Sequence, residues 1–243
     1  MTCIILAAGY ATRLYPVTEN FPKPLLEVKG KSILDWLLDD IVSTGLIDKF
    51  AVVTNSKFFN HFQKWASLSS YEITVLDDGT STNETRLGAV KDLWFTIERL
   101  NLSNDLLVIA GDNLLDFSLT GFINYSMQKS TSCIMRYHED DLAKLTGRGM
   151  VDVRNDDQVV KMWEKPDSPK SRWCVPPFYY FVYNDAMKIP QAISEGCGVD
   201  APGSFIEWLC ERSIVYAMEM PGKRFDIGCL ESYKKICEEY VPL

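Results

Sequence analysis

Short apolar runs alternate with amphipathic helical patterns through the first half of the chain. Each run is rich in aliphatic and β-branched residues, and the segment after it repeats its apolar residues at the three- and four-residue spacing of a helix. This alternation predicts an α/β fold with a mainly parallel sheet flanked by helices, because parallel neighbours need a crossover connection that is usually helical. The expected strands are residues 3–7, 50–54, 73–76 and 106–110, and the expected helices are residues 33–43, 57–66, 86–98 and 119–128.

The second half of the chain predicts several strands joined by polar turns, then two helices and a last strand. This pattern favours a mixed β subdomain. With 243 residues, 47% of them hydrophobic, and no obvious linker, the chain is expected to form a single domain with halves at residues 1–130 and 131–243. The strands are expected at residues 132–137, 150–154, 159–164, 178–183 and 214–218, and the helices at residues 186–193 and 204–211.

The most informative segment runs from residue 3 to residue 31. Its apolar strand ends at Gly9, and a turn of small residues after a buried strand lets backbone N–H groups approach a polyphosphate without obstruction. Arg13 adds a planar fork of donors that matches phosphate oxygens, and Lys23 adds a point charge. Because Lys23 lies between two prolines, its position is set by a stiff loop. The segment therefore predicts a phosphate-binding loop.

A second candidate site lies at the end of the apolar run 106–110, where Gly111-Asp112 follows directly. Ligands of open parallel sheets bind beyond the carboxyl ends of the strands, where both Gly9 and Asp112 are expected. A carboxylate in that place is suited to hold Mg²⁺ against a triphosphate. The sequence therefore predicts that Asp112 contributes to a metal and phosphate site.

Composition limits the functions that are open to the chain. A formal net charge of −8 argues against a nucleic-acid surface, so an anionic ligand must meet a local cationic site, for which Arg13, Lys23 and Lys165 are the candidates. No apolar run of about 18 residues exists and no basic leader precedes the first strand, so we expect no membrane span and a cytoplasmic location. The seven cysteines occur singly, which indicates reduced and mostly buried thiols.

Residues 3–36 resemble the opening signature of the sugar-phosphate nucleotidyltransferases, also called NDP-sugar pyrophosphorylases. That signature reads L-A-x-G-x-G-T-R-L-x-P-x-T, then P-K-P-L, then V-x-G-K-P-I-L. The chain departs from it at Ala11, where the family usually has glycine, and at Ser32, where it often has proline. A Cβ atom at position 11 costs strain unless φ is negative. The resemblance implies a Rossmann-like nucleotidyltransferase fold and a compact member of the family that lacks its C-terminal β-helix.

The resemblance also implies roles for single residues. Arg13 and Lys23 correspond to the catalytic cations. Asp112 in the Gly-Asp motif and Asp226 in the Asp-x-Gly motif correspond to the metal-binding aspartates. The implied nucleotide-binding residues are Leu6, Ala7, Ala8, Gly9, Thr12, Asn83, Gly88 and Asp112.

The sugar-phosphate pocket is implied by the tripeptide Glu164-Lys165-Pro166. In the family, this Glu contacts sugar hydroxyls and this Lys contacts the sugar's phosphate. Residues 1–130 then form the nucleotide-binding half, and residues 131–243 form the sugar-phosphate half. The Pro176-Pro177 pair stands where the family commonly has a glycine near the sugar, which indicates an unusual acceptor.

Recognition of the base is assigned to residues 77–89. In thymidylyl- and uridylyltransferases of the family, this region carries a Gln and a Gly that contact the pyrimidine. Gly88 matches the glycine and no Gln is present, so a pyrimidine nucleotide is favoured but the choice of nucleotide stays open. The Thr82-Asn83 pair also resembles cytidylyltransferases, and either residue could instead form a plain helix N-cap.

The resemblance implies transfer of a nucleoside monophosphate from an NTP to a sugar 1-phosphate, with Mg²⁺ as cofactor and pyrophosphate as the second product. Three alternatives stay open: a CTP-dependent cytidylyltransferase acting on phosphocholine or another non-sugar phosphate, a glycosyltransferase of the related fold, and a non-catalytic regulatory subunit that binds nucleotide. A glycosyltransferase would not need Arg13 and Lys23 at this spacing. No nucleic-acid or membrane partner is expected, and a homo-oligomer is compatible with the length.

Overall fold

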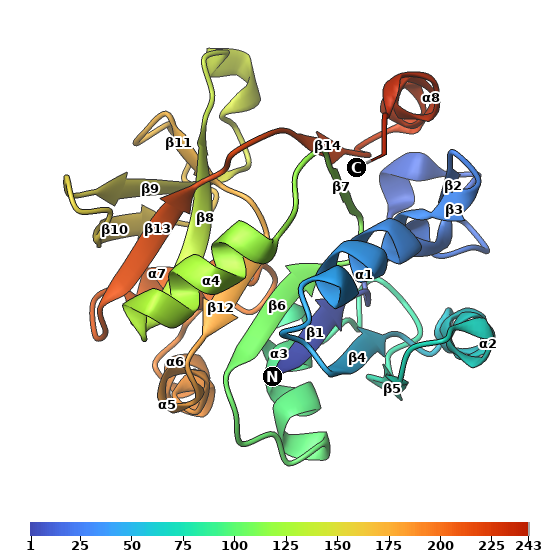
Figure 1. The fold of residues 1–243 in the computed structure, drawn as a ribbon, viewed down its shortest axis with the longest axis horizontal. Coiled ribbons are helices and arrows are strands. Elements are labelled where there is room, and N and C mark those ends of the chain that lie inside the picture. Colours follow the sequence, from blue (N-terminus) through green and yellow to red (C-terminus); the bar gives the residue numbers. More distant parts are fainter. Residues whose placement is uncertain (243) are drawn as a thin grey trace. The chain divides into compact units, whose positions relative to one another are not determined.

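The computed structural model describes residues 1–242, and Figure 1 shows the course of the chain. Two compact units are formed from interleaved segments. Unit 1 contains residues 1–87, 110–120 and the described part of 221–243, and unit 2 contains residues 88–109 and 121–220. The sequence predicted two contiguous halves that meet between residues 130 and 131, whereas each compact unit combines separate segments of the chain. The organisation of the chain as one domain stays a prediction.

Unit 1 is built around three parallel strands in the order β1-β4-β5. Strands β1 and β4 are buried along almost their whole length, which explains why their sequences are continuous apolar runs rather than alternating patterns. The predicted parallel strands and their helices are confirmed in this unit. Their bounds are β1 Thr2–Leu6, β4 Lys49–Thr54, β5 Ile73–Asp77, α1 Ile33–Ser43 and α2 Phe59–Leu68.

Helix α1 explains one departure from the family signature. The Oγ atom of Ser32 accepts a hydrogen bond from the N–H of Asp35 at 3.0 Å, so Ser32 is the N-cap of the helix. A serine cap satisfies a backbone donor that has no partner within the helix. The serine therefore replaces the usual proline without loss of the helix start.

The strand expected at residues 214–218 is present as β13, Val215–Glu219, but the expectation that it is the last strand is wrong. Strand β14 (Arg224–Asp226) and helix α8 (Leu230–Glu239) follow it, and β14 pairs antiparallel with β7 (Asn113–Leu115). Strands of three residues are too short to show an alternating pattern, so only their long-range pairing defines them. Unit 1 also contains the short elements η1 Thr12–Leu14, η2 Lys23–Leu25, β2 Glu27–Val28 and β3 Lys31–Ser32.

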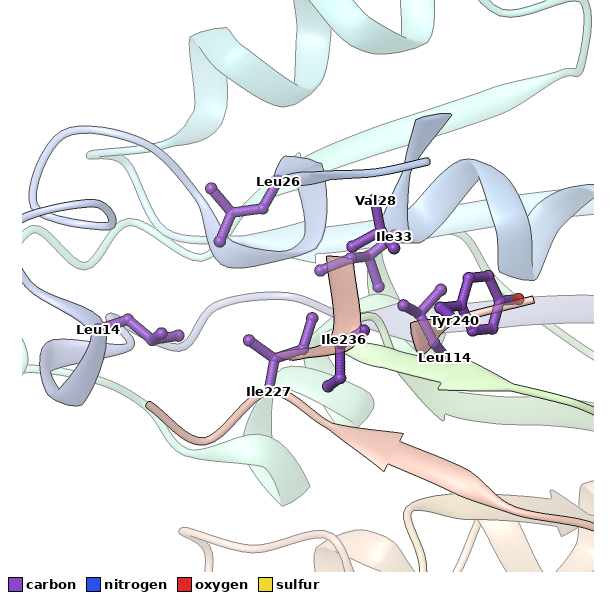
Figure 2. Close-up of a cluster of buried hydrophobic side chains, with 8 residues drawn as sticks. All are labelled: Leu14, Leu26, Val28, Ile33, Leu114, Ile227, Ile236 and Tyr240. Atoms are coloured by element: carbon purple, nitrogen blue, oxygen red, sulfur yellow. The ribbon is translucent and has the colours of Figure 1, made fainter. Parts of the chain in front are cut away.

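A cluster of buried apolar side chains supports β7 and β14 (Figure 2). Leu114 and Ile227 are both fully buried, and they lie next in sequence to Asn113 and Asp226. Burying a side chain of this size stabilises a fold by about 1.5–3 kcal/mol. The polar ends of the two short strands are thus held by the core beneath them, whose members are Leu14, Leu26, Val28, Ile33, Leu114, Ile227, Ile236 and Tyr240.

Unit 2 contains a mixed sheet in which β12 pairs antiparallel with both β6 and β8, and β13 pairs parallel with β8. Strand β11 pairs antiparallel with the carboxyl-terminal end of β8, β9 pairs antiparallel with β11, and β10 pairs antiparallel with β9. The predicted mixed β arrangement is confirmed. The strands are β6 Leu106–Ala110, β8 Ser132–His138, β9 Gly149–Val153, β10 Val159–Trp163, β11 Trp173–Val175, β12 Phe178–Phe181 and β13 Val215–Glu219.

Two predicted helices of unit 2 have different bounds in the structure. The segment expected at residues 186–193 is split, because Pro190 has no N–H for the carbonyl of Ala186 and the helix starts again at Ile189. The helix expected from residue 86 begins at Ala89 instead, with Gly88 as its N-cap. The helices are α3 Ala89–Arg99, α4 Thr120–Lys129, α5 Tyr183–Ala186, α6 Ile189–Ser194 and α7 Gly203–Leu209, with the 3-10 turn η3 Leu142–Lys144.

All seven cysteines are free thiols, but the expectation that most are buried is wrong. Only Cys3, Cys133 and Cys174 are buried, since they lie on strands of the core. Burial raises the pKa of Cys133 to about 11. Exposed Cys229, by contrast, has its pKa lowered by hydrogen bonding to Ser232.

None of the helices within residues 1–242 is long and apolar enough to span a lipid bilayer.

Candidate active site

The loop after β1 is tied to neighbouring strand ends by its backbone carbonyls. Fully buried Asn55 donates from Nδ2 to the Ala8 carbonyl at 2.9 Å and accepts at Oδ1 from the N–H of Phe58 at 3.1 Å. The N–H of Gly111 donates to the Leu6 carbonyl at 3.1 Å. These bonds fix the loop's path and leave Gly9 exposed. Asn55 was not predicted, although it lies at the carboxyl end of an apolar strand, as Gly9 and Asp112 do.

Three further residues of the loop are Ala11, which has a left-handed backbone conformation, and Thr12 and Arg13, which have exposed side chains. Ala11 has φ 48° and ψ 41°, the left-handed conformation for which the family's glycine is suited. Its carbonyl accepts from Thr18 Oγ1 at 2.8 Å, which helps to hold that conformation. Thr12 and Arg13 follow on η1 and are exposed, and Arg13 has no hydrogen-bond or ion-pair partner among residues 1–242. Its guanidinium is therefore available to an anion.

Lys23 brings the two predicted aspartates together in unit 1. Its Nζ donates to Asp112 Oδ2 at 2.6 Å and lies 4.0 Å from Asp226 Oδ1. The side chain of Lys23 is only 9% exposed. Asp226 reaches this place because β14 pairs with β7, with Asp226 opposite Asn113.

Two residues that were not predicted complete the arrangement. Asn113 donates from Nδ2 to Asp112 Oδ1 at 3.1 Å and to the Ala110 carbonyl at 3.0 Å. Arg224 donates from Nη1 to Asn113 Oδ1 at 2.7 Å, and its Nη2 lies 3.8 Å from Asp226 Oδ2. We call these five residues, Lys23, Asp112, Asn113, Arg224 and Asp226, the carboxylate ring. Asn113 and Arg224 lie beside the two aspartate motifs, which is the signal that could have found them.

The carboxylate ring keeps Asp112 ionised at neutral pH. Burial alone would raise the pKa of Asp112, but the charge and hydrogen bond of Lys23, with a smaller effect of Arg224, outweigh burial and lower that pKa below its ordinary value. An ionised carboxylate in this place can bind a hard cation, and Lys23 can bind an anion.

Glu164 and Lys165 lie in unit 2 at the end of β10. The N–H of Glu164 donates to Glu207 Oε2 at 3.1 Å, and Glu207 lies on α7. Lys165 is exposed in a left-handed conformation, φ 48°, and has no ion-pair or hydrogen-bond partner in the part of the chain that the structure describes. The turn therefore presents an unpaired ammonium next to a carboxylate.

Two glycines make room for the carboxylate of Glu164. A Cβ atom on Gly149 would lie 2.9 Å from Glu164 Oε2, and one on Gly203 would overlap the same oxygen and come within 2.7 Å of Met162 Cε. Burial raises the pKa of Glu164 to about 7, with Lys165 opposing the shift and Glu207 adding to it. This carboxyl group is therefore partly protonated at neutral pH.

We expect Gly203→Ala to destabilise the protein by about 1 kcal/mol, the lower end of the overpacking range, because the added methyl group meets only the ends of the flexible Glu164 and Met162 side chains. Urea unfolding measures the change. Gly121→Ala is the matched control. Gly121 also lies near the start of a helix, α4, and a Cβ atom there would meet only Met218 Cε, at an ordinary contact distance of 3.6 Å. An equal effect of the two substitutions would show that the site is not tightly packed.

The predicted base-recognition residues have local structural partners. Asn83 lies in a turn, where its carbonyl accepts from Arg86 Nη1 at 2.8 Å, so the expected N-cap at Thr82 or Asn83 is wrong. Gly88 has φ 92°, and a Cβ there would lie 2.5 Å from the Val199 carbonyl oxygen. Backbone packing alone therefore requires glycine at position 88.

Comparison with known proteins identifies the family. A family model described as nucleotidyl transferase matches residues 2–241. Over 70% of this chain, the sequence is 31% identical to a bifunctional protein GlmU of Methanococcus aeolicus, of which it spans 38%. It is 25% identical to the UTP–glucose-1-phosphate uridylyltransferase AglF of Haloferax volcanii, covering 94% of this chain and 91% of that protein.

A solved structure has the same fold. The crystal structure of apo UDP-glucose pyrophosphorylase matches with a TM-score of 0.82 and 19% identity, over 98% of this chain and 97% of that one. This likeness agrees with the predicted central sheet flanked by helices. Because the family model covers almost the whole sequence, the chain belongs to the nucleotidyl transferase family.

Proposed function

We propose that the protein transfers a nucleoside monophosphate from an NTP to a sugar 1-phosphate, forming an NDP-sugar and pyrophosphate. The observation that carries the proposal is the carboxylate ring, in which Lys23 contacts Asp112 and lies within 4.0 Å of Asp226, in the unit that holds the phosphate-binding loop. The name of the relative AglF, a UTP–glucose-1-phosphate uridylyltransferase, is consistent with this chemistry.

The donor set of the ring fits Mg²⁺. Asp112 and Asp226 offer hard carboxylate oxygens, and Mg²⁺ is commonly bound by one or two carboxylates together with substrate phosphates. Within residues 1–242, no group of three or more His, Cys, Asp or Glu side chains could hold a metal alone, so the other ligands would come from the nucleotide and water. Bound there, Mg²⁺ would neutralise charge on the triphosphate.

The proposed reaction needs no general base. The second pKa of a phosphate monoester is about 6, so the attacking oxygen of the sugar phosphate is mostly ionised near neutral pH. It forms a bond to the α-phosphorus, and the bond from that phosphorus to the bridging oxygen breaks, so that pyrophosphate leaves with the electron pair. Lys23 stabilises the α-phosphate, and Arg13 stabilises the leaving pyrophosphate. Catalysis is then mainly positioning and charge neutralisation.

In the same proposal, Lys165 binds the phosphate of the acceptor and Glu164 accepts hydrogen bonds from its sugar hydroxyls. The unpaired ammonium of Lys165 and the half-buried carboxylate of Glu164 in unit 2 support these roles. We further propose a pyrimidine nucleotide, because the relative AglF, which matches 94% of this chain, is named for UTP. A homo-oligomer is compatible with the chain, and sedimentation at several concentrations tests it.

The test is Mg²⁺-dependent release of pyrophosphate with each of UTP, dTTP, CTP, GTP and ATP. The acceptors are the 1-phosphates of glucose, mannose, N-acetylglucosamine and N-acetylmuramic acid, together with phosphocholine. Release with one NTP and one sugar phosphate supports the proposal and names both substrates. Release only with CTP and phosphocholine favours the cytidylyltransferase, and no release despite NTP binding favours a regulatory subunit.

The pKa of Glu164 predicts how acceptor binding depends on pH. We expect the KM for the sugar 1-phosphate to fall as the pH rises through about 7, because ionised Glu164 accepts stronger hydrogen bonds from hydroxyls. Glu164→Gln should abolish this step and leave only the change that comes from the acceptor's own phosphate, near pH 6.

The pH dependence of protein stability is a second measure of the raised pKa of Glu164. A carboxyl group with a raised pKa holds its proton longer in the folded state, so the free energy of unfolding should fall as the pH rises from the ordinary pKa of 4.5 towards 7. Glu164→Gln should remove that part of the pH dependence. An unchanged profile in the variant would contradict the assignment of the raised pKa.

A further inference from the structure

Each carboxylate of the ring is approached at both of its oxygens by groups of the same chain. Asp112 accepts from Lys23 at Oδ2, 2.6 Å, and from Asn113 at Oδ1, 3.1 Å. Asp226 has Lys23 Nζ at 4.0 Å from Oδ1 and Arg224 Nη2 at 3.8 Å from Oδ2. The two aspartates therefore share Lys23 on one side, and Asn113 and Arg224 take up their other oxygens.

The ring is balanced in charge. Two carboxylates face two cations, Lys23 and Arg224, whose side chains are only 9% and 11% exposed. A divalent cation held by both carboxylates would meet the ammonium of Lys23, which lies 2.6 Å from Asp112 Oδ2 and 4.0 Å from Asp226 Oδ1. The ammonium and a divalent cation therefore compete for the same oxygens.

The two cations of the ring differ in how they are held. Arg224 is a rigid fork that donates to the amide of Asn113 at 2.7 Å from a paired strand. Lys23 carries a compact charge on a flexible stem, and its closest partner is a single carboxylate oxygen. A triphosphate carries several negative charges, so it can draw Lys23 away from Asp112 while Arg224 keeps its place.

We propose that Lys23 is an internal counter-ion that keeps Asp112 and Asp226 closed to free divalent cations until a triphosphate draws its ammonium away. Metal and triphosphate then bind as one coupled event. The inference deepens the proposed function, because it takes the triphosphate to be that of the nucleotide substrate. The movement of the Lys23 ammonium from Asp112 to the triphosphate depends on the charges of the ring and does not depend on which acceptor the enzyme uses.

The test compares two binding measurements on the full chain and on Lys23→Met. Mn²⁺ alone is the probe of the metal site, and loss of the electron paramagnetic resonance signal of aqueous Mn²⁺ measures its binding. Inorganic tripolyphosphate in metal-free buffer is the probe of the anion site, measured by calorimetry. We expect Lys23→Met to bind Mn²⁺ at least about tenfold more tightly, since the competing charge is gone, and to bind tripolyphosphate at least about tenfold more weakly.

Three variants control this result. Lys64→Met makes the same change in net charge on the exposed face of α2, and its affinity for Mn²⁺ should stay that of the natural chain. Asp112→Asn added to Lys23→Met should abolish the gain in Mn²⁺ affinity, which places the tighter site in the ring. If Lys23→Met does not fold, Lys23→Gln replaces it in both measurements.

Equal or weaker binding of Mn²⁺ by the Lys23 variant would overturn the counter-ion role. Neither measurement uses turnover, so the two proposals can fail separately. A gain in Mn²⁺ affinity, in a protein that releases no pyrophosphate with any substrate pair, would keep the counter-ion role and reject the proposed reaction.

Discussion

Asp112→Asn is expected to lower turnover by more than about tenfold while the protein stays folded. The substitution keeps the size of the side chain but removes the charge that faces Lys23 at 2.6 Å. Without that charge, the ring loses one of its two carboxylate ligands for a divalent cation, and Lys23 loses its closest negative partner. Lys23→Ala is expected to lower turnover by more than about tenfold as well, because it removes the cation assigned to the α-phosphate.

Steady-state pyrophosphate release measures both effects, and thermal unfolding shows whether the fold persists. Asp116→Asn is the matched control, since Asp116 lies just beyond β7, is exposed and accepts from the N–H of Lys223 through an oxygen that asparagine also has. Its turnover should equal that of the natural chain. Unchanged turnover in both Asp112→Asn and Lys23→Ala would reject the assignment of the site.

Lys165→Met is expected to raise the KM for the sugar 1-phosphate roughly ten- to hundredfold and to leave the KM for the NTP unchanged. A hydrogen bond to a charged group contributes about 1.5–3 kcal/mol, which corresponds to that range. The expected effect is specific because the ammonium of Lys165 is exposed, and it has no competing partner within residues 1–242.

Lys161→Met provides the comparison for Lys165. Lys161 is an exposed residue of β10, the strand that ends two residues before Lys165, and its Nζ lies 5.9 Å from the centre of the Trp163 ring. We expect its substitution to change neither KM. Equal increases of the KM for the sugar 1-phosphate in the two variants would indicate a general loss of positive charge rather than a contact between Lys165 and the acceptor.

The sequence alone was enough to predict the α/β architecture and to propose a phosphate-binding loop, because both inferences depend on local patterns. The apolar runs that became β1 and β4 are continuous because those strands are buried, and helices α1 and α2 lie where their periodicity indicates them. The Gly9 turn, Arg13 and the proline-flanked Lys23 lie within one short segment. No long-range contact is needed to recognise them.

Tertiary structure alone decided how the site is completed. Asp226 joins Asp112 only because the three residues of β14 pair with β7, and the Arg224–Asn113 bond joins residues 111 positions apart. Glu207 likewise reaches Glu164 from a helix 43 positions later in the chain. Local periodicity carries no information about such pairing, since a three-residue strand has no period and a lone Asn or Arg has no pattern. Burial of Leu114 and Ile227 in a shared core supports the pairing of β7 with β14, and that core exists only once the chain has folded.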